Sequence, residues 1–99
     1  MKEKLIELIT AITKRPAMYG VNKVEDIALI ILGYTACSAV MGNNESDFNT
    51  EFKSFINTHF AMTGDHDWPR LIRFHSGGNL HSIELFSFLF SKYLIRSQT

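Results

Sequence analysis

The chain has 99 residues, of which 45% are apolar and eight are phenylalanines. This length and composition predict a single domain, residues 1–99, with a core of its own. Ten Lys and Arg residues balance ten Asp and Glu residues, and the lack of a basic excess argues against direct nucleic-acid binding.

The sequence shows no pattern typical of export or membrane insertion. Cys37 is the only cysteine, so no internal disulfide can form. Glu7 interrupts the first apolar segment, which also lacks a small-residue cleavage site. The most apolar stretch, residues 24–40, begins with charged residues, and its uninterrupted apolar run is too short to span a bilayer. We therefore expect a cytoplasmic protein without membrane association.

Apolar residues at helical spacing predict a first, amphipathic helix from Lys2 to about Thr13. Its apolar face comprises Leu5, Ile6, Ile9 and Ile12. The helix should end before Pro16, because the residue that precedes a proline disfavours the right-handed helical region. A turn should follow, in which Gly20 takes a positive φ.

A second helix is predicted from Asn22 to about Met41. Asn22 and Glu25 have the spacing of a capping box, in which Asn22 accepts from early backbone amides and Glu25 reaches back. The segment is apolar around most of its circumference, which predicts the central helix of the domain. Within it we expect Gly33 to allow close approach of another helix, and Cys37 to be a buried, inert thiol.

Two further helices are predicted before residue 79. A third helix, Asp47 to about Phe60, carries a stripe rich in phenylalanine. The stripe comprises Phe48, Phe52, Phe55, Ile56 and Phe60. Asp67 has the position of an N-cap for a fourth helix, with Trp68 and Pro69 in the first turn, where proline is tolerated.

The last helix is predicted from about Leu80 to Ile95. Its inward residues are Ile83, Phe86, Phe90, Tyr93 and Leu94. A strand is a weaker alternative for residues 83–90, where the 3.6-residue period favours a helix. Five helices with short polar connections predict an all-α, compact, bundle-like domain.

We find no motif that indicates catalysis or metal binding. Asp65, His66 and Asp67 place possible metal ligands together, but a site needs further convergent ligands, and turn or capping roles are favoured. The other histidines are expected at helix boundaries or on the surface; they are His59, His75 and His81. We therefore expect no catalytic residues, no metal and no cofactor.

The balanced total charge hides an acidic middle segment and a basic C-terminal segment. Residues 43–69 contain five acidic residues and one lysine, Lys53. The acidic residues are Glu45, Asp47, Glu51, Asp65 and Asp67. One interpretation is that the positive ends of helix dipoles favour these carboxylates. The other is an acidic face that binds a basic partner, and the two are compatible.

Several motifs resemble those of a known group of proteins. A first helix is followed by Arg15-Pro16-x-Met18-Tyr19-Gly20, and a later helix contains Gly33-Tyr34. With the phenylalanine-rich helices and a Trp that opens the fourth, the chain resembles small helical bacterial immunity proteins of contact-dependent growth inhibition and similar polymorphic-toxin systems. That group has one residue between the Tyr and the Gly of its R-P-x-M-Y-x-G corner, whereas Gly20 follows Tyr19 directly here.

The resemblance implies that the protein binds the C-terminal domain of a cognate toxin in the cytoplasm and blocks its active site or substrate cleft. Many such toxins are nucleases, EndoU-type ribonucleases among them, and an acidic inhibitor surface would compete with RNA for a basic cleft. The five acidic residues are then the expected binding residues. Arg15, Tyr19 and Tyr34 are expected to be structural, with Arg15 paired to an acid such as Asp26 and Tyr19 packed beneath the corner.

Two other classes of function remain open. The first is a helical adaptor or regulatory protein that binds another protein. The second is an enzyme or small-ligand sensor, in which His59 and His66 are the candidate functional residues.

Overall fold

The computed structural model describes residues 2–42, 47–64 and 66–97. The described residues form only helices and connecting turns, which confirms the predicted all-α fold. The elements are α1 (Lys2–Lys14), a 3₁₀ turn η1 (Pro16–Tyr19), α2 (Val24–Val40), α3 (Asp47–His59), α4 (Trp68–Phe74) and α5 (Asn79–Ser97). None of the described helices is long and apolar enough to cross a membrane.

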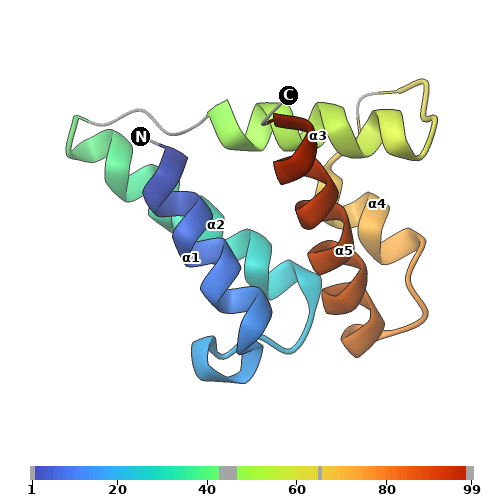
Figure 1. Ribbon diagram of the computed structural model, residues 1–99, viewed down its shortest axis with the longest axis horizontal. Helices are drawn as coiled ribbons and strands as arrows, with labels where there is room; N and C mark the ends of the chain where they lie inside the picture. The colour runs from blue at the N-terminus through green and yellow to red at the C-terminus, as the bar shows by residue number, and fades with distance from the viewer. Residues whose placement is uncertain (1, 43–46, 65, 98–99) are drawn as a thin grey trace.

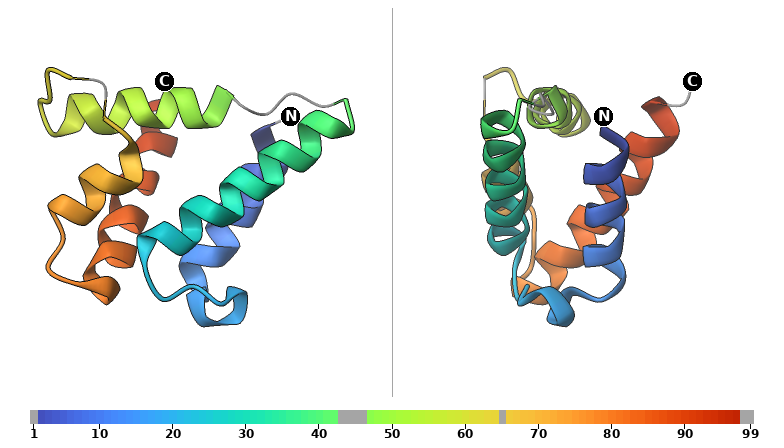
Figure 2. Two further views of the ribbon diagram at one scale, coloured as in Figure 1. Left: turned by 180° about the vertical axis from the view of Figure 1, so that it is seen from behind. Right: turned by 90° about the vertical axis from the view of Figure 1, so that its left-hand side faces the viewer.

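The helices lie in two groups, with α1 and α2 in one and α3, α4 and α5 in the other. Figure 1 shows α1 and α2 side by side and antiparallel, with α4 and α5 in the other half. Helix α3 runs across the top of Figure 1, and the two views of Figure 2 show the same crossing from behind and from the side. Helix α2 contacts α1, α4 and α5, and therefore joins the two groups.

One hydrophobic core is shared by all five helices. Its fully buried large side chains include Leu5, Ile9, Ile12, Ile27, Ile31, Phe48, Phe52, Ile56, Ile72, Phe86 and Leu89. These residues recur at helical spacing on one face of each helix, because burying that face removes the largest apolar area from water. The apolar stripes predicted for the first, third and last helices thus form the core, although four of their residues are only half-buried: Ile6, Phe55, Phe60 and Leu94.

The second helix contacts three others, as a central helix should, but it is less buried than its apolar sequence predicts. Helix α2 buries one stripe, which includes Val24, Ile27 and Ile31, and leaves Leu29 65% and Val40 87% exposed. Helices α1, α4 and α5 cover only this stripe, so the apolar residues on the opposite face of α2 are exposed to solvent. Because the segment has almost no polar residues to mark an outer face, periodicity could not show which side is exposed.

Two residues of α2 therefore have different surroundings from those predicted. Gly33 was expected to face a packed helix, yet a Cβ atom at this position would meet nothing within 4 Å. Cys37 was expected to be buried, and it is exposed. Both lie outside the stripe that the other helices cover. Tyr34 is half-buried and packs against the core.

The corner between α1 and α2 contains one confirmed prediction and two errors. Gly20 ends η1 with φ +70°, as expected for a turn that only glycine adopts easily. Within the described residues no ion pair joins Arg15 to Asp26, whose carboxylate Oδ2 instead accepts from the backbone N–H of Asn22 at 2.9 Å. Tyr19 does not pack beneath the corner, because η1 holds no buried residue. Pro16 begins η1, and Met18 is exposed.

The capping box predicted for α2 is also wrong. The residue at the N-cap position is Lys23, and its side chain makes no capping hydrogen bond. Ser82 of α5 instead accepts from the backbone N–H of Val24, and Glu25 is bonded to α4. The start of α2 is therefore held by residues distant in sequence.

Candidate functional site

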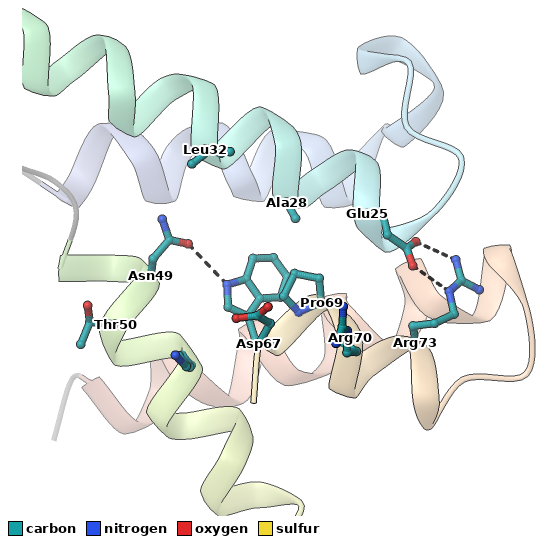
Figure 3. Close-up of a pocket in the computed structure, with 11 residues that line it drawn as sticks. Glu25, Ala28, Leu32, Asn49, Thr50, Asp67, Pro69, Arg70 and Arg73 are labelled. Carbon is teal, nitrogen blue, oxygen red and sulfur yellow. Dashed lines mark hydrogen bonds and ion pairs between the residues drawn. The ribbon is translucent and has the colours of Figure 1, made fainter. Parts of the chain in front are cut away.

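A groove of about 830 Å³ lies between α2, α3 and α4 (Figure 3). Helix α2 contributes Ala28 and Leu32 to one wall, and Figure 3 shows them across the groove from Pro69 of α4. Asn49 and Lys53 of α3 line the adjoining side. The groove therefore combines an apolar wall with polar and charged side chains, a composition found at protein-binding surfaces.

The first turn of α4 forms the part of the groove that faces α2. Trp68 is buried, its ring centroid lies 5.0 Å from that of Phe52, and its Nε1–H donates to Asn49 Oδ1 at 3.4 Å. Pro69 occupies the first turn, where a missing backbone N–H costs no hydrogen bond. The predicted start of this helix is confirmed, and its contacts with α3 fix this side of the groove.

A two-point ion pair closes one end of the groove. Arg73 of α4 donates from Nε to Glu25 Oε2 at 2.9 Å and from Nη2 to Glu25 Oε1 at 2.7 Å. The hydrogen bonds from the Arg73 guanidinium are the main reason that the pKa of Glu25 falls to about 2. Arg73 Nη2 also donates to Asn79 Oδ1 at 3.0 Å. This pair therefore ties α2 to α4 and to the first residue of α5.

Asp67 lines the groove, beside Pro69 (Figure 3). It precedes α4 in extended conformation, as predicted for an N-cap residue. In the part of the chain that the structure describes, however, its side chain makes no capping hydrogen bond. The carboxylate is exposed and lines the groove. It is therefore accessible to a cation carried by a partner.

The other predicted acidic residues are not gathered at this groove. Glu51 is exposed and accepts from the Tyr93 hydroxyl at 2.8 Å, in a second, smaller groove shared with Phe55 and Arg96. Burial of Tyr93, helped by this hydrogen bond, raises the pKa of its hydroxyl well above the usual range. Asp47 begins α3, and its side chain lies outside the description, as do residues Glu45 and Asp65. Glu51 and Asp67 thus line separate grooves along α3.

Comparison of the chain with protein-family models, with curated proteins and with solved structures gave no match. The resemblance based on the Arg15–Gly20 corner therefore stays a prediction.

The histidines make contacts that stabilise turns and helix ends. The His75 ring stacks on Phe60 with centroids 3.9 Å apart, and His59 lies edge-on to the same ring at 4.9 Å. The backbone of His66 is held by the Asn57 side chain, and His81 Nδ1 accepts from the Gly77 backbone N–H. Within the described ranges, no three potential ligands form a group that could hold a metal ion.

Several groove residues were missed by sequence reasoning. These are Ala28, Leu32, Asn49, Lys53, Arg70 and Arg73. The Glu25–Arg73 pair spans 48 residues, so no local spacing indicates it. The Trp-Pro start of α4 was visible in the sequence, but only the packing of α2 against α4 makes it a wall of a groove.

Proposed function

We propose that this protein is a cytoplasmic, non-catalytic immunity protein that binds and neutralises a cognate toxin domain, with the groove between α2, α3 and α4 as part of its binding face. The observation that carries the proposal is the exposed Asp67 carboxylate, which lines this groove and makes no capping bond among the described residues. The Arg-Pro corner and the Gly33-Tyr34 pair in the sequence support the toxin as the partner.

Within the groove, the Asp67 carboxylate is the feature that suits a nuclease as that toxin. A nuclease cleft carries cations that hold phosphates, and a carboxylate that lines a groove with an apolar wall can pair with such a cation. Leu32 and Pro69 offer apolar contact next to that charge. Because Lys53, Arg70 and Arg73 also line the groove, Asp67 is expected to confer orientation and capture rate, with packing supplying much of the affinity. A partner that also reaches the second groove, on the other side of α3, would meet the Glu51 carboxylate there.

If the gene immediately upstream of the one for this chain encodes a toxin domain, as the proposal predicts, the direct test is co-expression with that domain. We expect the two proteins to copurify, and we expect cleavage of RNA by the toxin domain to stop at equimolar inhibitor. Copurification without loss of cleavage would instead support an adaptor role. Failure to bind the toxin domain would overturn the proposal.

A charge reversal tests the role of Asp67. Asp67→Lys should slow association with the toxin domain several-fold at low salt, and the effect should shrink as salt screens the charges. Glu84→Lys is the matched control, because Glu84 is exposed on α5 and does not line the groove. Equal association rates for the two variants would place the binding face elsewhere, provided that circular dichroism shows both to be folded.

A further inference from the structure

The exposed face of α2 carries an apolar strip that none of the other described helices covers. The strip consists of Leu29, Gly33, Ala36 and Val40, all exposed and all directly opposite the buried stripe. Their spacing of four, three and four residues keeps them on one line along the helix, as in the seam of a coiled coil. An uncovered apolar strip of this kind is typical of an interaction surface, and its coiled-coil spacing suits another helix.

The order of residues along this α2 strip is symmetric. A large residue, two small residues and a large residue follow one another, and the midpoint lies between Gly33 and Ala36. We propose that the α2 strip pairs, antiparallel, with the same strip of a second copy of this chain. A two-fold axis through the midpoint then places Leu29 against Val40 of the second copy, and Gly33 against its Ala36.

The steric and electrostatic properties of the strip both suit a second copy. At Gly33 no heavy atom beyond the local backbone of α2 lies within 4 Å of where a Cβ would be, and Gly33 and Ala36 together allow two backbones to approach closely at the crossing point. No charged residue occurs from Ile27 to Met41. The protein has a formal net charge of zero, so two copies meet no overall repulsion. A charged nuclease cleft would find no complementary group on this face.

The available area sets the strength of the dimer. Each α2 helix is about 25 Å long, and in the dimer each would contact the other only through its strip. With two large and two small residues per copy, the strips bury well under the roughly 1,200 Å² typical of stable interfaces. We therefore expect a dimer that forms at micromolar concentrations or above and dissociates on dilution.

This inference does not depend on the proposed function. None of the four strip residues lines the groove that holds Asp67; the residues of α2 that do so are Glu25, Ala28 and Leu32. A variant of the strip that is monomeric should still bind the toxin domain, and Asp67→Lys should still dimerise. The two proposals can therefore fail separately.

Sedimentation equilibrium over a wide concentration range is the first test. We expect the apparent mass of the native chain to rise toward twice the monomer mass, and Leu29→Glu to stay monomeric. Leu80→Glu is the control, because Leu80 is 68% exposed and Leu29 65%, while Leu80 lies on α5 away from the strip. A native chain that stays monomeric, or two variants that lose association equally, would overturn the proposal.

Cross-linking tests the antiparallel arrangement. In a Cys37→Ser background, Leu29→Cys and Val40→Cys are made as separate proteins and oxidised with diamide, which takes up the two electrons and two protons that the thiols release. We expect disulfide-linked dimers only when the two proteins are mixed, because each introduced cysteine faces the other position of the second copy. Cross-links within either protein alone would indicate a parallel pair and overturn the two-fold arrangement proposed.

Discussion

The hydroxyl of Ser82 in α5 accepts a hydrogen bond from the backbone N–H of Val24 at 3.0 Å, and so caps α2 from 58 residues away in sequence. Ser82 is fully buried, and its own hydroxyl proton is donated to the Asn79 carbonyl at 2.6 Å. Side chains at helix starts usually perform this role locally. Here α5 performs it, so the beginning of α2 depends on tertiary packing.

Ser82→Ala should therefore destabilise the protein. The substitution leaves the N–H of Val24 buried without an acceptor, which costs about 1–3 kcal/mol of unfolding free energy. Urea denaturation followed by circular dichroism measures this loss. Ser87→Ala is the control, because Ser87 on the same helix only donates back to the Ile83 carbonyl, and its removal should be near neutral. Equal losses for both variants would show that the cap contributes nothing.

The Glu25–Arg73 pair should make stability depend on pH in the acid range. The pKa of Glu25 is about 2 in the folded protein, against an ordinary value of 4.5. A lowered pKa means that the stabilisation is complete above about pH 4.5 and is lost as the pH falls toward 2. Glu25→Gln should thus be less stable than the native protein at neutral pH and equally stable near pH 2. Denaturation at a series of pH values tests this, and a pH-independent difference would contradict it.

Phe52 should be among the residues most sensitive to truncation. It is fully buried, and its ring contacts the rings of Phe48, Phe55, Trp68, Phe86, Phe90 and Tyr93. Phe52→Ala should cost about 3–5 kcal/mol, because the cavity is lined by rigid rings. Phe52→Leu should cost less, and it keeps the test interpretable if the alanine variant is unfolded. Phe88→Ala, at an exposed position of α5, should change the denaturation midpoint little.

Ala61 is a site where glycine should stabilise the fold. It follows α3 with φ +55°, and the next residue, Met62, donates its backbone N–H to the Asn57 carbonyl at 2.9 Å. This is the geometry of a helix end that normally has glycine in the left-handed position. Ala61→Gly should raise stability by about 0.5–1 kcal/mol, seen as a higher melting temperature. Ala11→Gly is the control: within α1, glycine should lower the melting temperature. A lower melting temperature for Ala61→Gly would contradict the argument.

Cys37 should react readily in the folded protein. Its side chain is exposed on α2, so a thiol reagent needs no unfolding to reach it. In dilute native protein, we expect the rate of reaction with a disulfide reagent to be within a few-fold of that in urea. Absorbance of the released thiolate measures both rates, with Cys37→Ser as the blank. Protection by several orders of magnitude would restore the interpretation of a buried thiol.

Amphipathic helices were the part of the fold that the sequence could predict. In Lys2–Lys14 and Asp47–His59 apolar residues recur at helical spacing among polar ones, so the sequence alone predicted which side is buried. Val24–Val40 is nearly all apolar, and its exposed side could be found only from where α1, α4 and α5 lie. The predictions for Gly33 and Cys37 were wrong because both residues lie on this exposed side of α2.

The candidate site was predictable only in fragments. The positions of Asp67, Trp68 and Pro69 were predicted, because capping and first-turn preferences are local. The groove was not, because Leu32 and Asn49 reach it from different helices. The capping box failed for a related reason: Ser82 and Arg73, both distant in sequence, bind the groups at the start of α2.

The long-range capping of α2 has a consequence for synthesis on the ribosome. Translation proceeds at roughly 5–20 residues per second, so the nascent α1–α2 hairpin exists for seconds before residues 73–82 are made. Over that interval the start of α2 lacks both the Ser82 acceptor and the Arg73 cation. Chains interrupted before α5 would keep the apolar face of this hairpin uncovered and be subject to proteolysis. Quality control in the cell would then favour chains that include α5.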